Sequence, residues 1–266
     1  MSDTAQRDFI RYECSDRIAT ITFARPEKLN AFSDAMVMRL AEILHQFDTD
    51  PDADVAVLHG EGRAFCSGAD VHQRQLRSEA ELKKLGGPQG WGAHSSELFT
   101  RSINWKPVIS APHGFAVGLG LAMVLESDLI VAAPGTKFQV TETTRGLAAS
   151  RHWALLAYRG LRSFATEVTI TGRFFTAEEA RAAGVVDRVA APDQHLAEAY
   201  EMARAVAANP PLSVRATVRS RRWYMEQAER EAYLQTNPLK LHLTEDFKDS
   251  ARAFAEKRKP GPFKGQ

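Results

Sequence analysis

The chain has 266 residues, enough to bury a large core in one or two domains, and its 44% hydrophobic and 25% charged residues are ordinary for a globular protein. A net charge of +1 argues against a nucleic acid or an anionic membrane as the main partner. Two cysteines in unrelated contexts, Cys14 and Cys66, and a polar start without a signal-peptide pattern predict a cytoplasmic location.

Strands and helices are expected to alternate over the first two thirds of the chain. Apolar alternation or short apolar runs predict strands at 17–23, 55–60, 107–110 and 128–132. Ser33 is the expected N-cap of an amphipathic helix that runs to Phe47, and residues 176–179 (TAEE) form a capping box. We expect a mobile excursion at 71–92, and helices at about 197–208, 212–234 and 244–259. This pattern is typical of an α/β protein with a helical C-terminal third.

Two glycine-rich junctions are the most informative feature of the chain. Residues 62–70 (GRAFCSGAD) and 114–120 (GFAVGLG) each place glycines between a strand-like run and a segment that can begin a helix. Such junctions leave backbone N–H groups pointing outward, and the helix dipole adds positive potential there. Two converging N–H groups can stabilise an oxyanion, by roughly 3 kcal/mol per donor. A thioester enolate is one anion that would need them.

Five motifs in order make the chain resemble the crotonase (enoyl-CoA hydratase/isomerase) superfamily. They are RPEKLNA at 25–31, AFCSGAD at 64–70, PVISAPHGFAVGLG at 107–120, a block at 170–189 that begins ITG, and FAEKRK at 254–259. The resemblance covers about residues 18–264 and implies an α/β fold, a crotonase-like spiral of ββα units with a C-terminal helical region. It divides the chain into a core with an acyl-CoA site at 1–192 and a region at 193–266 that forms homotrimers or homohexamers.

The resemblance also implies the residues of the site. The backbone amides of Ala69 and Leu119 would hold the thioester oxygen, and Lys257 would approach the phosphates of coenzyme A from a neighbouring subunit. The implied substrate-binding residues are Lys28, Ala69, Asp70, Val71, Gly118 and Lys257. Asp70 is equally well read as the cap of the following helix. We expect no cofactor beyond the coenzyme A of the substrate, and no metal, because no cluster of His, Cys or carboxylates has ligand spacing.

One catalytic glutamate is expected, where the family has up to two. Glu142 falls on one position, but the other falls on Ala122, which cannot transfer a proton. Glu126, one helical turn further on, is a poor substitute because it would lie about 6 Å deeper along the axis. A single glutamate here resembles 3,2-enoyl-CoA isomerases and also hydratases that use one carboxylate, including the hydroxycinnamoyl-CoA type. We therefore expect an acyl-CoA enzyme with an enolate mechanism, with isomerisation slightly favoured over hydration.

Further departures from the family pattern keep an alternative open. Leu119 replaces a glycine, which would cost about 1 kcal/mol or more if the position required positive φ. Residues 147–152 (LAASRH) replace a proline and a glycine-rich turn, and bring Ser150 and His152 near the pocket. The alternative is a protein that kept the fold and binds coenzyme A or RNA without catalysis. The basic cluster of the C-terminal third is read as a solvated face or subunit contact, with RNA binding less favoured: Arg215, Arg219, Arg221 and Arg222.

Overall fold

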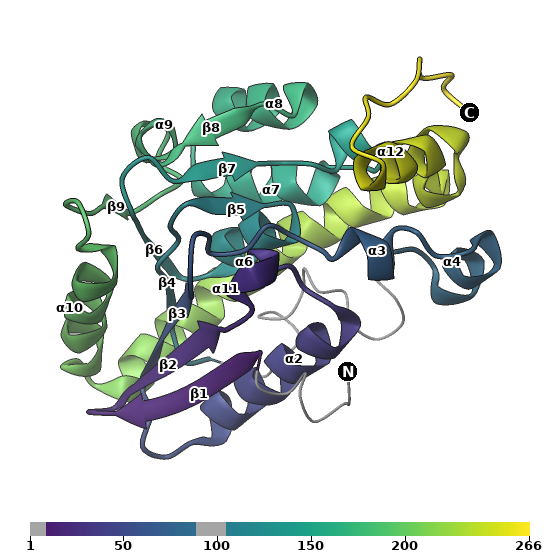
Figure 1. Cartoon of the computed structure of the whole chain (residues 1–266). Helices are drawn as coiled ribbons and strands as arrows, with labels where there is room; N and C mark the ends of the chain where they lie inside the picture. Colours follow the sequence, from purple (N-terminus) through teal and green to yellow (C-terminus); the bar gives the residue numbers. More distant parts are fainter. Residues whose placement is uncertain (1–8, 89–104) are drawn as a thin grey trace.

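The computed structural model describes residues 9–88 and 105–266, and two sheets form its centre (Figure 1). The larger sheet has six strands in the order β1-β2-β3-β4-β6-β9. Their bounds are Ile10–Ser15, Ile18–Phe23, Val55–Gly60, Val108–Ser110, Leu129–Ala132 and Arg188–Val189. Only the β1–β2 pair in this sheet is antiparallel. The smaller sheet has the order β5-β7-β8, with bounds Phe115–Val117, Lys137–Gln139 and Phe174–Thr176.

Helix α2 (Asp34–Thr49) makes the crossover between the parallel strands β2 and β3. The Ser33 side chain accepts a hydrogen bond from the Met36 N–H, so the predicted N-cap is confirmed. The buried residues of α2 recur at helical spacing and fill the core against the sheet: Met36, Val37, Leu40, Ile43, Leu44 and Phe47.

The middle of the chain contains the helix expected after the second glycine-rich junction and two helices that the sequence pattern did not indicate. Helix α6 (Leu119–Glu126) is buried along its whole length, and α7 (Ser150–Arg159) and α8 (Arg162–Thr171) follow a single 3-10 turn, η2 (Thr143–Arg145). The predicted capping box before α9 (Ala177–Ala182) is confirmed, because Thr176 and Glu179 exchange both hydrogen bonds.

The excursion expected at 71–92 contains two short helices in its described part, and its mobility stays a prediction. Asp70 and Ser78 each cap a helix, α3 (Val71–Arg74) and α4 (Glu79–Leu85). The Ser78 cap is a reciprocal capping box, which fixes the first turn of α4 locally. Residues 89–92 lie outside the described part of the chain.

Three helices and two 3-10 turns form the C-terminal part. They are α10 (His195–Ala207), α11 (Pro211–Thr236), η3 (Asn237–Leu239), η4 (Leu241–Leu243) and α12 (Glu245–Ala255), which ends four residues before the predicted Lys259. Ala199 and Ala203 of α10 pack on the large sheet, while α11 crosses the molecule obliquely toward α12 (Figure 1). The boundary after residue 192 stays a prediction. None of the described helices is both long and apolar enough to span a bilayer.

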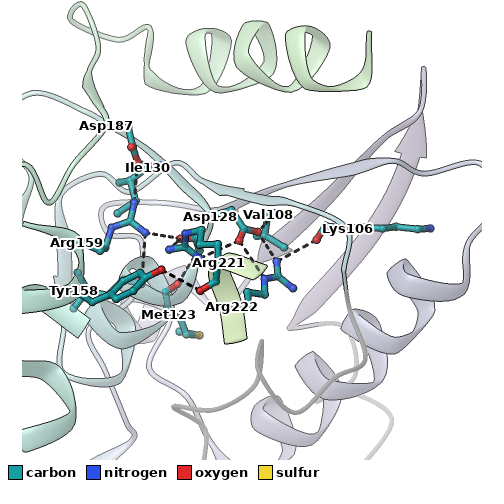
Figure 2. A network of polar contacts seen from close by, with 12 residues as sticks. Lys106, Val108, Met123, Asp128, Ile130, Tyr158, Arg159, Asp187, Arg221 and Arg222 are labelled. Carbon is teal, nitrogen blue, oxygen red and sulfur yellow. Dashed lines mark hydrogen bonds and ion pairs between the residues drawn. The ribbon is translucent and has the colours of Figure 1, made fainter. Parts of the chain in front are cut away.

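Buried ion pairs fix α11 to the beginnings of the interior strands β4 and β6, as Figure 2 shows. Asp128, which precedes β6, accepts hydrogen bonds from Arg221 Nη1 at 3.0 Å and from Arg222 Nε at 3.1 Å. Its other oxygen accepts from the Val108 N–H at 2.8 Å and thereby holds β4. Burial alone would raise the pKa of Asp128, but the two guanidinium charges outweigh it and lower that pKa.

The prediction of a solvated basic face is therefore wrong for part of the cluster. Arg222 is only 5% exposed and Arg221 is ion-paired with Asp128. Arg215 contacts Asp54 at 3.3 Å, and the Arg219 guanidinium lies 4.2 Å from the centre of the Trp105 ring. These arginines hold the helix to the protein.

Candidate active site

A pocket of about 600 Å³ brings together nearly all of the candidate residues. Its lining includes Lys28, Ala69, Asp70, Val71, Gly118, Leu119 and Glu142. Lys257 is not among the lining residues and lies beyond the end of α12. The pocket therefore joins segments that are separated by more than 100 residues in the sequence.

The first glycine-rich junction presents the backbone N–H of Ala69. Ala69 forms a parallel bridge with Phe32, in which Gly68 O accepts from Phe32 N at 2.8 Å and Asp70 N donates to Phe32 O at 2.9 Å. Because its two neighbours make these bonds, the Ala69 N–H points to the opposite side of the strand. Within the described ranges, this N–H has no hydrogen-bond acceptor.

The second junction presents the backbone N–H of Leu119 beside that of Ala69. Leu119 is the first residue of α6, and its N–H likewise has no acceptor among the residues that the structure describes. A Cβ on Gly68 would lie 3.8 Å from the Leu119 nitrogen and 2.8 Å from Val117 O, so the two junctions touch here. Gly68 has φ +98° and could not carry a side chain at this contact.

The leucine at position 119 carries no backbone strain. The positive φ falls on the preceding residue, Gly118, with φ 52° and ψ −116°. Leu119 itself is not among the residues with positive φ. The strain that a positive φ would have caused at Leu119 is therefore absent, because Gly118 makes the turn into the helix.

Glu142 lies directly beside Gly118. A Cβ on Gly118 would be 3.6 Å from Glu142 Oε1 and 2.6 Å from Thr141 Oγ1. The Glu142 side chain is 21% exposed, and Oε2 is buried with no hydrogen-bond partner in the described ranges. The open side of the carboxyl group is therefore Oε1, which can reach a ligand in the pocket.

Glu126 does not supply the second carboxylate that Ala122 lacks. Ala122 lines the pocket, whereas Glu126 is fully buried and is not among the lining residues. The guanidinium of Arg151 binds Glu126 Oε1 at 2.8 Å and Glu229 Oε2 at 3.0 Å. Glu126 thus belongs to an internal ion-pair cluster between α6, α7 and α11.

Asp70 has partners within the chain for both of its carboxylate oxygens. Oδ1 accepts from the Gln73 N–H at 3.4 Å as the cap of α3, and Oδ2 contacts Arg25 Nη1 at 3.1 Å. The capping alternative is confirmed, while a contact with coenzyme A stays a prediction. Sequence analysis placed Arg25 in a motif but gave it no role; its guanidinium joins this segment to the turn that carries Lys28.

The end of α11 forms a polar wall that the sequence did not indicate. Tyr233, Thr236 and Asn237 line the pocket together with His152 and Ser150 of α7. The Ser150 and Thr236 hydroxyl groups are 2.8 Å apart. No periodic signal could have located this wall, because its partners lie 86 residues apart. Among the described residues, no three His, Cys, Asp or Glu side chains form a group that could hold a metal ion.

Comparisons with known proteins show the family of the chain. The sequence profile of the enoyl-CoA hydratase/isomerase family matches residues 13–266. Mevalonyl-coenzyme A hydratase of Aspergillus fumigatus is 34% identical over 249 residues, covering 91% of this chain and 90% of that protein. (E)-Benzylidenesuccinyl-CoA hydratase of Thauera aromatica is 32% identical over 263 residues, covering 96% of this chain and 99% of that protein.

Solved structures show the same family and its fold. The carnitinyl-CoA dehydratase from Mycobacterium avium 104 superposes with a TM-score of 0.80 at 30% identity, covering 97% of this chain and 99% of that one. The expected crotonase-like α/β fold with its C-terminal helical region is confirmed. The chain belongs to the enoyl-CoA hydratase/isomerase family and is an enzyme that acts on an acyl-CoA thioester.

Proposed function

We propose that the protein adds water reversibly to the conjugated double bond of a 2-enoyl-CoA thioester, with Glu142 as its single proton carrier. The observation that carries this proposal is that the N–H groups of Ala69 and Leu119 have no acceptor among the described residues and lie beside the open oxygen of Glu142. Isomerisation was slightly favoured from the sequence. The relatives described above are named as hydratases or as a dehydratase, which favours hydration for this chain.

The two amides would hold the thioester oxygen. As the enolate forms, the electron pair of the conjugated system moves onto this oxygen, and donors already in place need no reorganisation. The Leu119 N–H also lies at the positive end of α6, which adds to the stabilisation. Two donors of this kind contribute roughly 3 kcal/mol each.

Glu142 would handle the proton in both directions. In hydration its carboxylate takes a proton from the attacking water as the water oxygen bonds to the β-carbon, and Glu142 then returns that proton to the α-carbon. In isomerisation the same carboxylate would take the α-proton and return it to the γ-carbon. Neither route needs a redox cofactor, and the coenzyme A of the substrate is the only nucleotide group that the proposal uses.

The remaining substrate contacts are assigned by position. Lys28, Asp70 and Val71 line the side of the pocket formed by η1 and α3, which suits the adenine and phosphates of coenzyme A. Lys257 fits the proposal only as a residue supplied to the site of a neighbouring subunit in a homotrimer or homohexamer. A cytoplasmic location remains part of the proposal. The polar wall at Ser150 and Thr236 suits an acyl group with a hydroxyl or carboxylate substituent.

A panel of CoA thioesters tests the proposal. The purified protein is incubated with 2-enoyl-CoA and 3-enoyl-CoA substrates, with both alkyl and polar acyl groups, and products are followed by mass and by the absorbance of the conjugated thioester. We expect a gain of one water from 2-enoyl substrates. New conjugation without a mass change would instead show isomerisation, and binding without any turnover would support the non-catalytic alternative.

Substitution of the glutamate identifies its role. E142Q is expected to lose turnover by at least about 100-fold while its affinity for butyryl-CoA, which has no double bond, changes little. The matched control is E201Q, the same substitution at an exposed residue of α10. Equal activity of E142Q and E201Q would refute the assignment.

A further inference from the structure

Three of the described arginines line the pocket, and they differ in whether the chain supplies a counter-charge. Arg74 pairs with Asp34 Oδ1 at 3.2 Å, and Arg151 is held by two glutamates of the internal ion-pair cluster. Arg145 makes no ion pair with any residue that the structure describes. Its guanidinium is therefore the one in the described lining that lacks a carboxylate partner.

The N–H edge of the Arg145 guanidinium is open to a ligand. The central carbon lies over the Phe254 ring, 3.9 Å from its centre, and Nη1 donates to the carbonyl oxygen of Ser250 at 3.3 Å. Nε and Nη2 have no acceptor in the described ranges, and neither nitrogen is fully buried. These two nitrogens form a fork that fits both oxygens of a carboxylate, and contact with the ring uses only the face of the group.

Burial makes a charge without a partner costly at this position. Arg145 is half-buried, and burial lowers the pKa of its guanidinium, which the charge of Glu142 opposes without cancelling the shift. The guanidinium still carries its charge at neutral pH. Asp70, the other carboxylate of the described lining, is bound to Arg25. An anionic ligand would therefore supply the counter-charge that the chain does not provide here.

Arg145 and Glu142 lie on the same side of η2. Glu142 directly precedes this 3-10 turn and Arg145 ends it, and side chains three positions apart eclipse one another in such a turn. Both side chains line the pocket. An acyl chain that runs from the two amides past Glu142 can therefore reach Arg145 with its far end.

A second cation and the polar wall lie at this end of the pocket. Helix α12, which carries Phe254, packs against both η2 and η4. Lys240 precedes η4 and lines the pocket, and its Nζ contacts the neutral side chain of Asn237 at 3.3 Å. Asn237 directly follows Thr236 of the polar wall. This end of the pocket thus combines two positive charges with neutral hydrogen-bonding groups, a combination that suits an anion.

We propose that Arg145 binds a carboxylate at the far end of the acyl group, so that the enzyme acts on coenzyme A thioesters of dicarboxylic acids. Nε and Nη2 each donate to one carboxylate oxygen, and Lys240 adds positive potential. The proposal rests on the substrate placement of the proposed function, since it sets the double bond beside Glu142. Arg145 determines specificity and takes no part in the proton transfer.

Pairs of saturated thioesters test this assignment by binding alone. The two members of a pair have the same number of carbons and differ in a terminal carboxylate: glutaryl-CoA and valeryl-CoA, adipyl-CoA and hexanoyl-CoA, suberyl-CoA and octanoyl-CoA. Their affinities are measured by isothermal titration calorimetry. At one length or more, we expect the carboxylate form to bind about tenfold to 100-fold more tightly than its alkyl partner. No preference at any of these lengths would overturn the proposal.

Substitution of Arg145 identifies the source of the preference. R145M removes the charge but keeps a chain that can pack on Phe254, so the two members of a pair should bind within about threefold of each other. Its affinity for the alkyl member should change little. R145K keeps the charge without the fork and should show a weaker preference than the unsubstituted enzyme.

The matched control is R219M. Arg219 also lies over an aromatic ring, 4.2 Å from the centre of Trp105, but is not among the residues that line the pocket. R219M removes the same charge and the same kind of ring contact, and it should keep the full preference for the carboxylate form. Loss of the preference in R219M as large as that in R145M would overturn the assignment to Arg145.

A structural role of Arg145, or a contact with the phosphates of coenzyme A, gives a different result. In either case R145M would weaken adipyl-CoA and hexanoyl-CoA by the same factor and leave the preference unchanged, which would overturn the proposal. The binding ratios do not require turnover. If the preference is present and is lost in R145M while no 2-enoyl thioester gains water, the proposed hydration fails and the assignment of Arg145 stands. Hydration without any carboxylate preference is the reverse result.

Discussion

Gly118 is the residue whose replacement tests the geometry of the site most severely. Its φ of 52° and ψ of −116° lie outside the regions open to residues with a side chain. A Cβ would also lie 2.6 Å from Thr141 Oγ1. Backbone strain and overpacking together predict that G118A lowers the free energy of unfolding by about 3 to 5 kcal/mol.

Two further variants separate strain from clash. Gly135 has φ 66° and would place a Cβ with nothing within 4 Å, so G135A should lose only about 1 kcal/mol. T141A in the G118A background removes the clashing hydroxyl and should recover about 1 to 3 kcal/mol, but not the strain. The measurement is urea unfolding followed by tryptophan fluorescence, which the four tryptophans of the chain allow.

The same substitution should impair catalysis in the folded fraction. A shift of Gly118 displaces the Leu119 N–H and the neighbouring Glu142 carboxyl group together. A misplacement of about 1 Å is enough to reduce the rate about 100-fold. If G118A were no less stable than G135A and exchanged the α-protons of butyryl-CoA normally, the reasoning from this contact would be refuted.

Three further predictions concern the framework around the site. D128N leaves buried guanidinium groups without a counter-charge, so it should cost about 3 to 5 kcal/mol in urea unfolding. The pKa of Asp128 is lowered in the folded protein, so its ionised form contributes fully to the free energy of unfolding above the unfolded pKa of about 3.9. That contribution is lost as the pH falls below this value. The free energy of unfolding of D128N should therefore decrease less steeply at acidic pH. Burial raises the pKa of the Cys66 thiol to about 12, whereas Cys14 is exposed. A thiol reagent at pH 8 should therefore modify Cys14 alone in the native protein and both cysteines in denaturant. Two reactive thiols without denaturant would contradict this. E126Q should change turnover per folded molecule by less than about threefold, because Glu126 lies outside the pocket; a loss as large as that of E142Q would restore it as a second catalytic carboxylate.

Local signals explain which elements were predictable. Strand β3 coincides with the prediction at 55–60, since a short apolar run ends at a glycine. The caps at Ser33 and Thr176 depend only on residues three positions away. Strand β1 escaped notice because most of its residues are exposed, and antiparallel pairing with β2 holds it in place.

The candidate site also contains some features that could be predicted from the sequence and others that could not. The two proposed amide donors could be located from the sequence because backbone N–H groups at glycine junctions need no particular side chain, as Leu119 illustrates. The contacts of His152 with Gly118 and of Thr236 with Ser150 join residues 34 and 86 positions apart. No local pattern encodes such contacts, because they depend on how α7 and α11 pack.

A crystal structure of E142Q with bound crotonyl-CoA would test the central claim most directly, because the variant should bind this 2-enoyl thioester without consuming it. The account predicts that the thioester oxygen lies about 3 Å from the nitrogens of both Ala69 and Leu119, with the carbons of the double bond facing residue 142. A thioester oxygen held elsewhere in the pocket, with either amide still unpaired, would contradict it.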